Sequence, residues 1–317
     1  MQQNDTVITV KGLKKSYGTN QVLKGVNFSV RRGTMLALLG PNGAGKTTTV
    51  RILSTLLKAD GGAVTIEGYD VLKEPQKVRT VIGLTGQSAA VDEMLTGREN
   101  LVMMGRLYHL TKASSKARAE ELLRDFDLVD AADRPLKTYS GGMRRRLDLA
   151  VSLIATPPVI FLDEPTTGLD PRSRQGMWDI IKQLLAAGTT ILLTTQYLDE
   201  ADQLADNIVV IDGGKVIAEG TAKELKARVG KDRLELTFAG PKALQAARDL
   251  LGEKVVDVHD KDNSLTTVIN DTNKDVKDVL EALDDAKISV ASMNVHKPTL
   301  DDVFIALTGK TKQKAED

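Results

Sequence analysis

One stretch, residues 40–48, constrains the fold of this chain more than any other part of the sequence. It fits the pattern Gly-x-x-x-x-Gly-Lys-[Ser/Thr] of phosphate-binding loops. An apolar run at 35–39 precedes it and predicts a buried strand, and a helical pattern from 46 to about 57 follows it. This strand–loop–helix order favours a nucleotide-binding loop over a glycine-rich turn that fits the pattern by chance.

The composition of this loop predicts how it holds phosphate. Glycines let the backbone curl until its N–H groups point at phosphate oxygens, and the next helix presents its positive N-terminus to the same group. We expect Lys46 to reach the β- and γ-phosphates of ATP and the Thr47 hydroxyl to bind Mg²⁺. The predicted nucleotide-binding residues are Gly40, Pro41, Asn42, Gly43, Ala44, Gly45, Lys46, Thr47 and Thr48.

A second site element is the apolar run at 159–162 that ends in Asp163 and Glu164. In open α/β folds nucleotides bind at the carboxyl ends of the strands, which is where these two acids are expected. We expect Asp163 to hold Mg²⁺, directly or through water, and Glu164 to take a proton from the attacking water as a general base. Two solvated acids at a strand end are the alternative, and the phosphate loop makes it the weaker one.

Strand and helix signals alternate along the chain and predict an α/β fold with a mostly parallel sheet covered by helices. The segment 96–155 is a helical insertion, with a capping box at Thr96 and Glu99 and helices at 113–126 and 141–155. The expected strands are 6–10, 21–30, 35–39, 63–67, 81–84, 159–163, 190–195 and 207–211.

A smaller second domain is expected after the pattern lapses at 227–231. Its elements read β-α-β-β-α-β, the ferredoxin-like order, followed by a helix that starts at Thr299. The predicted organisation is an ATPase domain at 1–227 with a helical subdomain at about 88–156, an α+β accessory domain at 231–309, and a polar tail at 310–317.

Composition narrows the function classes. Lys and Arg together number 43 and Asp and Glu 43, so the formal net charge is zero and no broad field attracts nucleic acid or an anionic membrane. The chain has no cysteine, which excludes disulfides and thiolate metal sites. Its apolar runs are far shorter than the roughly 20 residues that span a bilayer, and we expect no signal peptide. A membrane role is therefore expected to go through a partner.

Further motifs accompany these elements. Residues 139–143 (Tyr-Ser-Gly-Gly-Met) precede a helix, and residues 166–170 (Thr-Thr-Gly-Leu-Asp) follow the carboxylate pair. With these motifs in order, the chain resembles the ATP-binding subunits of ABC transporters over about 6–226. Residues 195–202 (Thr-Gln-Tyr-Leu-Asp-Glu-Ala-Asp) and 297–304 (Lys-Pro-Thr-Leu-Asp-Asp-Val-Phe) are similar to the daunorubicin/doxorubicin-resistance ATP-binding family.

The resemblance implies roles for more residues. Tyr17 would stack on adenine, and Gln87 would sense Mg²⁺ and the attacking water while moving against a membrane partner. Asp170 would link two ATP sites across a dimer, because the phosphate loop of one copy and the signature of the other enclose the same nucleotide. The implied signature residues, which close over ATP held by the second copy, are Ser140, Gly141 and Gly142.

The chain departs from the general pattern at a few positions. Tyr139 and Met143 replace the leucine and glutamine of the usual signature, and neither change removes the serine hydroxyl or the glycines. Gln196 replaces the usual switch histidine; glutamine donates hydrogen bonds but carries no charge and relays no proton. We therefore expect Gln196 to position the γ-phosphate and Glu164 to be the main base.

The arginines at 144–146 and the three histidines lie outside these motifs, and we expect no catalytic role for them. The arginines at 144–146 fan around a helix axis, which favours solvated or intersubunit contacts over a nucleic-acid patch. The three histidines are interpreted as ordinary surface or packing residues rather than metal ligands. They are His109, His259 and His296.

The favoured function is an ATPase subunit bound to the cytoplasmic face of the cell membrane through a multi-spanning permease. Two copies would sandwich ATP and Mg²⁺, and closure would push on the permease through the surface at 87–101 to export a drug, antibiotic or lipid-like compound. A soluble ABC ATPase acting on the ribosome or DNA stays open as the alternative, although such proteins usually carry two cassettes or a long coiled coil. A small-molecule kinase has no use for the signature, and a non-enzymatic drug-binding protein would not need Glu164.

Overall fold

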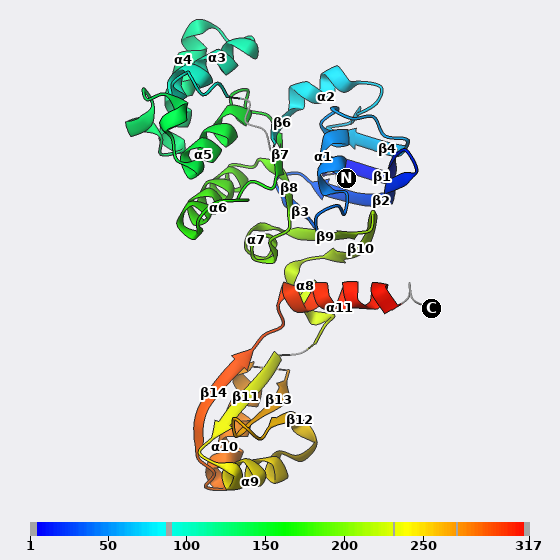
Figure 1. The fold of residues 1–317 in the computed structure, drawn as a ribbon, viewed down its shortest axis with the longest axis vertical. Helices are drawn as coiled ribbons and strands as arrows, with labels where there is room; N and C mark the ends of the chain where they lie inside the picture. Colours follow the sequence, from blue (N-terminus) through cyan, green and yellow to red (C-terminus); the bar gives the residue numbers. More distant parts are fainter. Residues whose placement is uncertain (1–4, 87–90, 231, 271, 314–317) are drawn as a thin grey trace. The chain divides into compact units, whose positions relative to one another are not determined.

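The computed structural model describes residues 5–86, 91–230, 232–270 and 272–313, without the side chains of 272 and 308–313 (Figure 1). The chain forms two compact units, Met1–Ala222 and Lys223–Asp317. No helix within the described ranges combines the length and the apolar content that crossing a bilayer requires.

A six-stranded sheet with the order β10-β9-β3-β8-β7-β6 is the frame of the first unit. All neighbours in it are parallel except β10, which pairs with β9 antiparallel. Strands β3, β7 and β8 are buried along their whole length, as expected for strands covered on both faces. The predicted mostly parallel sheet is confirmed, and β10 has no counterpart among the predicted strands. The bounds are Met35–Leu39 for β3, Ile82–Thr85 for β6, Val159–Asp163 for β7, Thr190–Thr195 for β8, Asn207–Asp212 for β9 and Lys215–Gly220 for β10.

The first unit also contains a four-stranded antiparallel sheet with the order β2-β1-β4-β5. The sequence predicts some of these strands but not a separate sheet, and it ends the first strand at residue 10, whereas β1 continues to Tyr17. Register shifts between Val10 and Leu13 explain the difference, because such irregularities break the alternation that marks a strand. The bounds are Thr6–Tyr17 for β1, Asn20–Arg31 for β2, Gly61–Ile66 for β4 and Tyr69–Asp70 for β5.

Helices complete the first unit, and α3, α4 and α5 follow β6 as the predicted helical insertion (Figure 1). Thr96 caps α3, and both hydrogen bonds of the predicted capping box with Glu99 are present. Helix α1 ends earlier than expected, before Thr55, whose φ of 65° is incompatible with a helix. The bounds are Lys46–Leu53 for α1, Pro75–Val81 for α2, Gly97–Leu107 for α3, Lys112–Asp125 for α4, Gly141–Ser152 for α5, Pro171–Ala186 for α6 and Leu198–Leu204 for α7.

The second unit contains the predicted β-α-β-β-α-β order, with a sheet arranged β12-β13-β11-β14. Alternate apolar residues of β11, including Leu234 and Leu236, form a core with α9 and α10, which confirms the ferredoxin-like arrangement. The bounds are Ala222–Ala227 for α8, Asp232–Phe238 for β11, Pro241–Leu251 for α9, Val255–His259 for β12, Ser264–Ile269 for β13, Thr272–Asp285 for α10, Val290–His296 for β14 and Leu300–Gln313 for α11.

Candidate functional site

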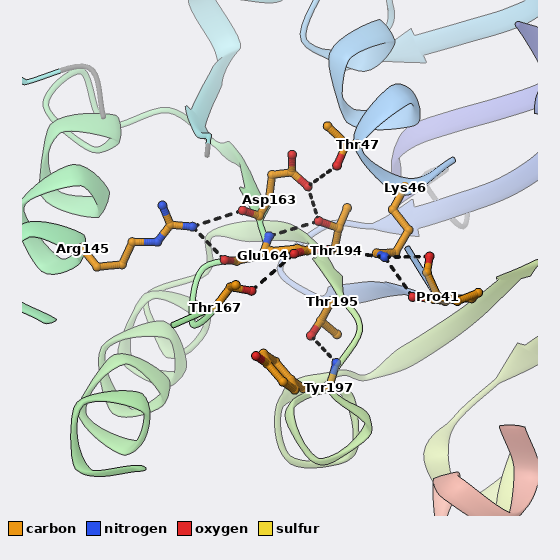
Figure 2. A network of polar contacts seen from close by, with 11 residues as sticks. Pro41, Lys46, Thr47, Arg145, Asp163, Glu164, Thr167, Thr194, Thr195 and Tyr197 are labelled. Carbon is orange, nitrogen blue, oxygen red and sulfur yellow. Dashed lines mark hydrogen bonds and ion pairs between the residues drawn. The ribbon is translucent and has the colours of Figure 1, made fainter. Parts of the chain in front are cut away.

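The glycine-rich loop joins β3 to α1 and wraps around a buried lysine. Lys46 is only 4% exposed, and its Nζ donates to the carbonyl oxygens of Gly40 (2.9 Å) and Pro41 (3.2 Å). The same Nζ lies 3.4 Å from Oε1 of Glu164 (Figure 2). The ammonium is thus held inside the loop, next to the second acid after β7. A buried charge of this kind requires such partners.

Two glycines of the loop are required by its shape. Gly45 has a φ of 107°, and a Cβ there would lie 2.5 Å from Cδ2 of Leu23. A Cβ on Gly40 would lie 2.2 Å from the carbonyl oxygen of Ile211. Any larger residue would push the loop away from the sheet. Both glycines therefore let the loop lie tightly against its neighbours.

Asp163 ends β7 and is joined to the first turn of α1. Its Oδ1 accepts a hydrogen bond from Oγ1 of Thr47 at 3.3 Å, so the two predicted Mg²⁺ ligands lie together (Figure 2). In the described part of the chain, no three acids or histidines gather into a metal cage. The pair of a hydroxyl and one carboxylate fits Mg²⁺, which proteins usually bind through one or two carboxylates and the substrate's phosphates.

Glu164 has a strained backbone that neighbouring groups hold in place. Its φ is 51°, in the left-handed region, where a residue with a side chain pays about 1–3 kcal/mol. Its N–H donates to the carbonyl oxygen and to Oγ1 of Thr194, at 3.1 and 3.2 Å. Its Oε2 accepts from Oγ1 of Thr167 at 3.3 Å. The strained turn aims the carboxylate at Lys46.

Thr194 is a site residue that the sequence interpretation misses. It lies opposite Asp163 in the parallel pairing of β7 and β8 and is fully buried. Its Oγ1 donates to Oδ1 of Asp163 and accepts from the N–H of Glu164, so one hydroxyl fixes both acids. The sequence does contain a signal for this residue: Thr194 and Thr195 form a pair at the carboxyl end of a buried strand, where polar residues are rare without a hydrogen-bond partner.

The segment after β8 contains Gln196, which is partly buried and follows the strand directly. The turn is fixed by a hydrogen bond from the Tyr197 N–H to Oγ1 of Thr195 at 2.9 Å. Further on, the buried Glu200 accepts from Oγ1 of Thr166 at 2.8 Å and from Nε1 of Trp178 at 3.2 Å. Burial raises the pKa of this carboxyl. Glu200 therefore joins α7 to α6 and to the segment after the carboxylate pair.

The signature residues begin α5. Ser140 is the N-cap of this helix, with its Oγ accepting from the Met143 N–H at 3.3 Å, and both Ser140 and Gly141 are exposed, while Gly142 is partly buried. Tyr139, which replaces the usual leucine, is buried and donates its hydroxyl to the Ala131 carbonyl oxygen at 2.6 Å. The tyrosine thus fixes the start of α5 within the helical insertion.

The remaining predicted site residues lie on other elements. Tyr17 ends β1 and is 48% exposed, with Nζ of Lys15 at 5.8 Å from its ring centroid. Asp170 caps α6, and its bonds to the hydroxyl and N–H of Ser173 lower the pKa of this carboxyl. Gln87 lies outside the described residues. The structure therefore brings together the phosphate loop and the two acids, whereas Tyr17 lies at the end of β1 and Asp170 at the start of α6.

The interpretation of the three arginines at 144–146 as solvated is wrong for Arg145, and all three make contacts within the chain. Arg144 pairs with Glu93, and Arg146 donates to the carbonyl oxygens of Phe126 and Asp127. Arg145 donates to backbone carbonyl oxygens of the loop after β7. The three side chains fan around the axis of α5 and reach different segments of the chain.

A pocket of about 470 Å³ lies between the first turns of α5 and the loop after β7. Asp148 lines it, and burial raises the pKa of this carboxyl to about 6, against the opposing effect of Arg145. The lining residues are Gly141, Arg144, Arg145, Asp148, Glu164, Thr167, Gly168 and Leu169.

The histidines lie elsewhere. His109 follows α3 with a φ of 64°. In the second unit, His259 and His296 line one pocket of about 470 Å³ although they are far apart in sequence. Their Nε2 atoms lie 3.4 Å from Asp257 and 2.8 Å from Glu235, respectively. These imidazole–carboxylate contacts line a polar pocket.

Comparison with known proteins identifies the family. Residues 23–167 match the family described as "ABC transporter", and residues 220–308 match "ATP-binding protein DrrA1-3-like, C-terminal domain". The daunorubicin resistance ATP-binding protein DrrA3 of Streptomyces coeruleorubidus is 52% identical, over 98% of this chain and 99% of that protein. The daunorubicin/doxorubicin resistance ATP-binding protein DrrA of Streptomyces peucetius is 51% identical, over 99% of this chain and 98% of that protein.

A solved structure agrees with the fold of the first unit. It is a dimeric ATP-binding cassette in a post-hydrolysis state with ADP and Pi, 26% identical, with a TM-score of 0.62. The match covers 68% of this chain and 98% of that one. Together with the phosphate loop and the paired acids, these matches confirm the resemblance noted in the sequence. The chain belongs to the ABC transporter ATP-binding proteins of the daunorubicin/doxorubicin-resistance type, and it is an ATP hydrolase.

Proposed function

We propose that this chain powers the export of a drug, antibiotic or lipid-like compound through a separate membrane-spanning permease. The relatives are named for resistance to daunorubicin and doxorubicin, which supports an exported cargo of that chemical kind. The observation that carries the proposal is the meeting of Lys46 and Glu164 beside the Thr47–Asp163 pair. This arrangement puts a phosphate-binding cation and a proton acceptor at one point.

The proposed roles of the site residues follow from their contacts. Lys46 would exchange its carbonyl partners for the phosphate oxygens of ATP, and the loop N–H groups would complete the phosphate site. Thr47 and Asp163 would hold Mg²⁺, which when bound neutralises charge on the phosphates. Glu164 would accept the proton of the attacking water once phosphate draws Lys46 away from it. Gln196 would position the γ-phosphate and Gln87 would sense the metal.

The second half of each ATP site is proposed to come from a second copy of the chain. Ser140 and Gly141 are exposed at the N-terminus of α5, where their donors are free to meet the phosphates of a partner's ATP. Asp170 would link the two sites, and Tyr17, half exposed at the end of β1, would stack on adenine. The dimeric cassette with ADP and Pi supports this arrangement. Closure of the homodimer on ATP would drive the export step.

We also propose that the parts of the chain have different roles. Residues 1–227 would form the ATPase domain, with a helical subdomain at about 88–156 that meets the permease through the surface at 87–101. Residues 231–309 would form an accessory domain, and 310–317 a polar tail. The protein would then sit at the cytoplasmic face of the membrane without contacting nucleic acid.

The test is to identify what binds the tagged chain. Membranes from its native cells are solubilised in mild detergent, and the co-purifying proteins are quantified by mass spectrometry. A Lys46→Ala variant serves as a control, because loss of ATP binding leaves the proposed permease surface intact. We expect a multi-spanning membrane protein in near-equal amount with both forms. Recovery of ribosomes or DNA-bound complexes instead would favour the soluble alternative and overturn the export role.

A further inference from the structure

Among the described residues, the guanidinium of Arg145 donates only to backbone carbonyl oxygens of the site. Its Nη2 donates to Asp163 at 3.2 Å and to Glu164 at 2.8 Å (Figure 2). Its Nε donates to Pro165 at 2.7 Å. Its Nη1 donates to Gly86 at 2.9 Å. One planar group on α5 therefore joins the ends of two neighbouring strands, β6 and β7.

These acceptors share a position that matters for the site. Three of them belong to consecutive peptide units at the point where the chain leaves β7, and Glu164 is the middle one. The fourth, Gly86, directly precedes Gln87. Buried backbone carbonyl oxygens need donors, and a guanidinium supplies several in one plane. The Glu164 carbonyl oxygen also accepts from the Thr167 N–H at 3.3 Å. Arg145 thus supplies side-chain donors to three consecutive carbonyl oxygens of this turn.

The conformation of Glu164 explains why the turn needs support. A φ of 51° is unfavourable for a residue with a side chain, and it persists only where the surroundings enforce it. Thr194 binds the N–H side of Glu164, and Arg145 binds its carbonyl side. The strained peptide is therefore clamped from β8 and from α5 at the same time.

We propose that Arg145 is a positioning residue for hydrolysis, which holds the Glu164 backbone so that its carboxylate faces the phosphate site. This inference rests on the proposed role of Glu164 as general base. Among the described residues, Arg145 donates to no side chain that is proposed to bind nucleotide, so its loss should slow the chemical step and leave ATP affinity nearly unchanged. Because it also binds Gly86, it ties the start of the signature helix to the segment before Gln87.

The neighbouring arginine provides a matched control. Within the described ranges, Arg146 makes its hydrogen bonds through Nη1, which donates to the carbonyl oxygens of Phe126 and Asp127 and to Oδ2 of Asp127. A lysine ammonium has three donors on one nitrogen and can replace such a group. It cannot replace the three nitrogens with which Arg145 spans four carbonyl oxygens. Arg145→Lys and Arg146→Lys are therefore the same chemical change with different expected results.

The experiment measures steady-state ATPase kinetics, ATP and ADP affinity, and melting temperature for both lysine variants and for Glu164→Gln. We expect Arg145→Lys to lower kcat about 10-fold or more with nucleotide affinity changed less than about two-fold, and Arg146→Lys to keep kcat within about two-fold. Equal kcat for the two lysine variants, with Glu164→Gln inactive, would overturn the inference alone. Wild-type turnover in Glu164→Gln would overturn the proposed base and the inference with it.

A second readout separates positioning from simple stability. Arg145 lines the pocket between α5 and the loop after β7, so small cations have a space to occupy when its side chain is cut back. For Arg145→Ala we expect millimolar guanidinium chloride to restore part of the lost kcat, while Arg146→Ala gains nothing. Guanidinium that fails to raise kcat in folded Arg145→Ala, or raises it equally in both variants, would count against a positioning role.

Discussion

The carboxyl of Asp148 offers a prediction about stability whose size and pH dependence both follow from the structure. Asp148 is partly buried on α5, and burial raises its pKa from 3.8 to about 6 in the folded protein. A carboxyl with a raised folded pKa holds its proton more tightly in the folded state than in the unfolded state. Stability therefore falls as the pH rises from about 4 to about 6, and the penalty is complete above pH 6. Asp148→Asn should remove this penalty.

The magnitude follows from the shift. The difference between 3.8 and about 6 corresponds to roughly 3 kcal/mol at about 1.4 kcal/mol for each pKa unit. Since Asp148 keeps some contact with water, screening reduces the expected gain to about 1–2 kcal/mol. Asp148→Asn should thus raise the free energy of unfolding by that amount at pH 7.5. About half of the gain should be left at pH 5, because the carboxyl is then protonated in most folded molecules.

Urea unfolding followed by tryptophan fluorescence suits this measurement. Trp178 is the only tryptophan and lies buried on α6, so its signal reports the unit that contains Asp148. Asp125→Asn, a change at an exposed aspartate of α4, is the matched control and should shift stability by less than about 0.5 kcal/mol. A gain that is the same at pH 5 and pH 7.5, or a loss of stability at pH 7.5, would refute the linkage argument.

Two further substitutions test the geometry of the site. Thr194→Val keeps the side-chain volume but removes the hydroxyl that binds Asp163. We expect the free energy of unfolding, measured in urea, to fall by about 2–3 kcal/mol, and Mg²⁺-dependent ATP binding, measured by calorimetry, to weaken. Thr194→Ser keeps the hydroxyl and should behave nearly as the wild type does. Gly45→Ala would force a Cβ against Leu23 and should lower the free energy of unfolding by about 1–3 kcal/mol. A Cβ on Gly176 of α6 would meet open space, so Gly176→Ala should be neutral or stabilising by up to about 1 kcal/mol. A Gly45→Ala protein as stable as Gly176→Ala, or a Thr194→Val protein that binds Mg²⁺ and ATP as the wild type does, would contradict this geometry.

The phosphate loop and the paired acids were predictable because short contiguous patterns determine their local geometry. The order strand, glycine loop, helix places Lys46 at the N-terminus of the helix, inside the loop. An apolar strand that ends in Asp163 and Glu164 places both acids at the carboxyl edge of the sheet. The ferredoxin-like order of the second unit was predictable for the same reason, since each element carries its own periodicity.

Other parts of the site depend on which strands and helices lie side by side, and sequence periodicity does not contain that information. Thr194 meets Asp163 only because β8 pairs with β7 in one register. Arg145 looked like a solvated helix residue, since its position gives a direction around the axis but not the loop that the helix packs against. The separate sheet of β1 and β2 was missed because register shifts interrupt its alternation.

The central claim, a homodimer that closes on ATP and opens after hydrolysis, is tested most directly by the mass of Glu164→Gln in solution. Light scattering with Mg²⁺ and ATP should give twice the 34.3 kDa of one chain, and the single mass with ADP. Adding Ser140→Asp preserves the cap of α5 but sets a negative charge against the partner's phosphates, so the dimer should be lost. A Glu164→Gln protein that binds ATP and stays at 34.3 kDa would contradict the account.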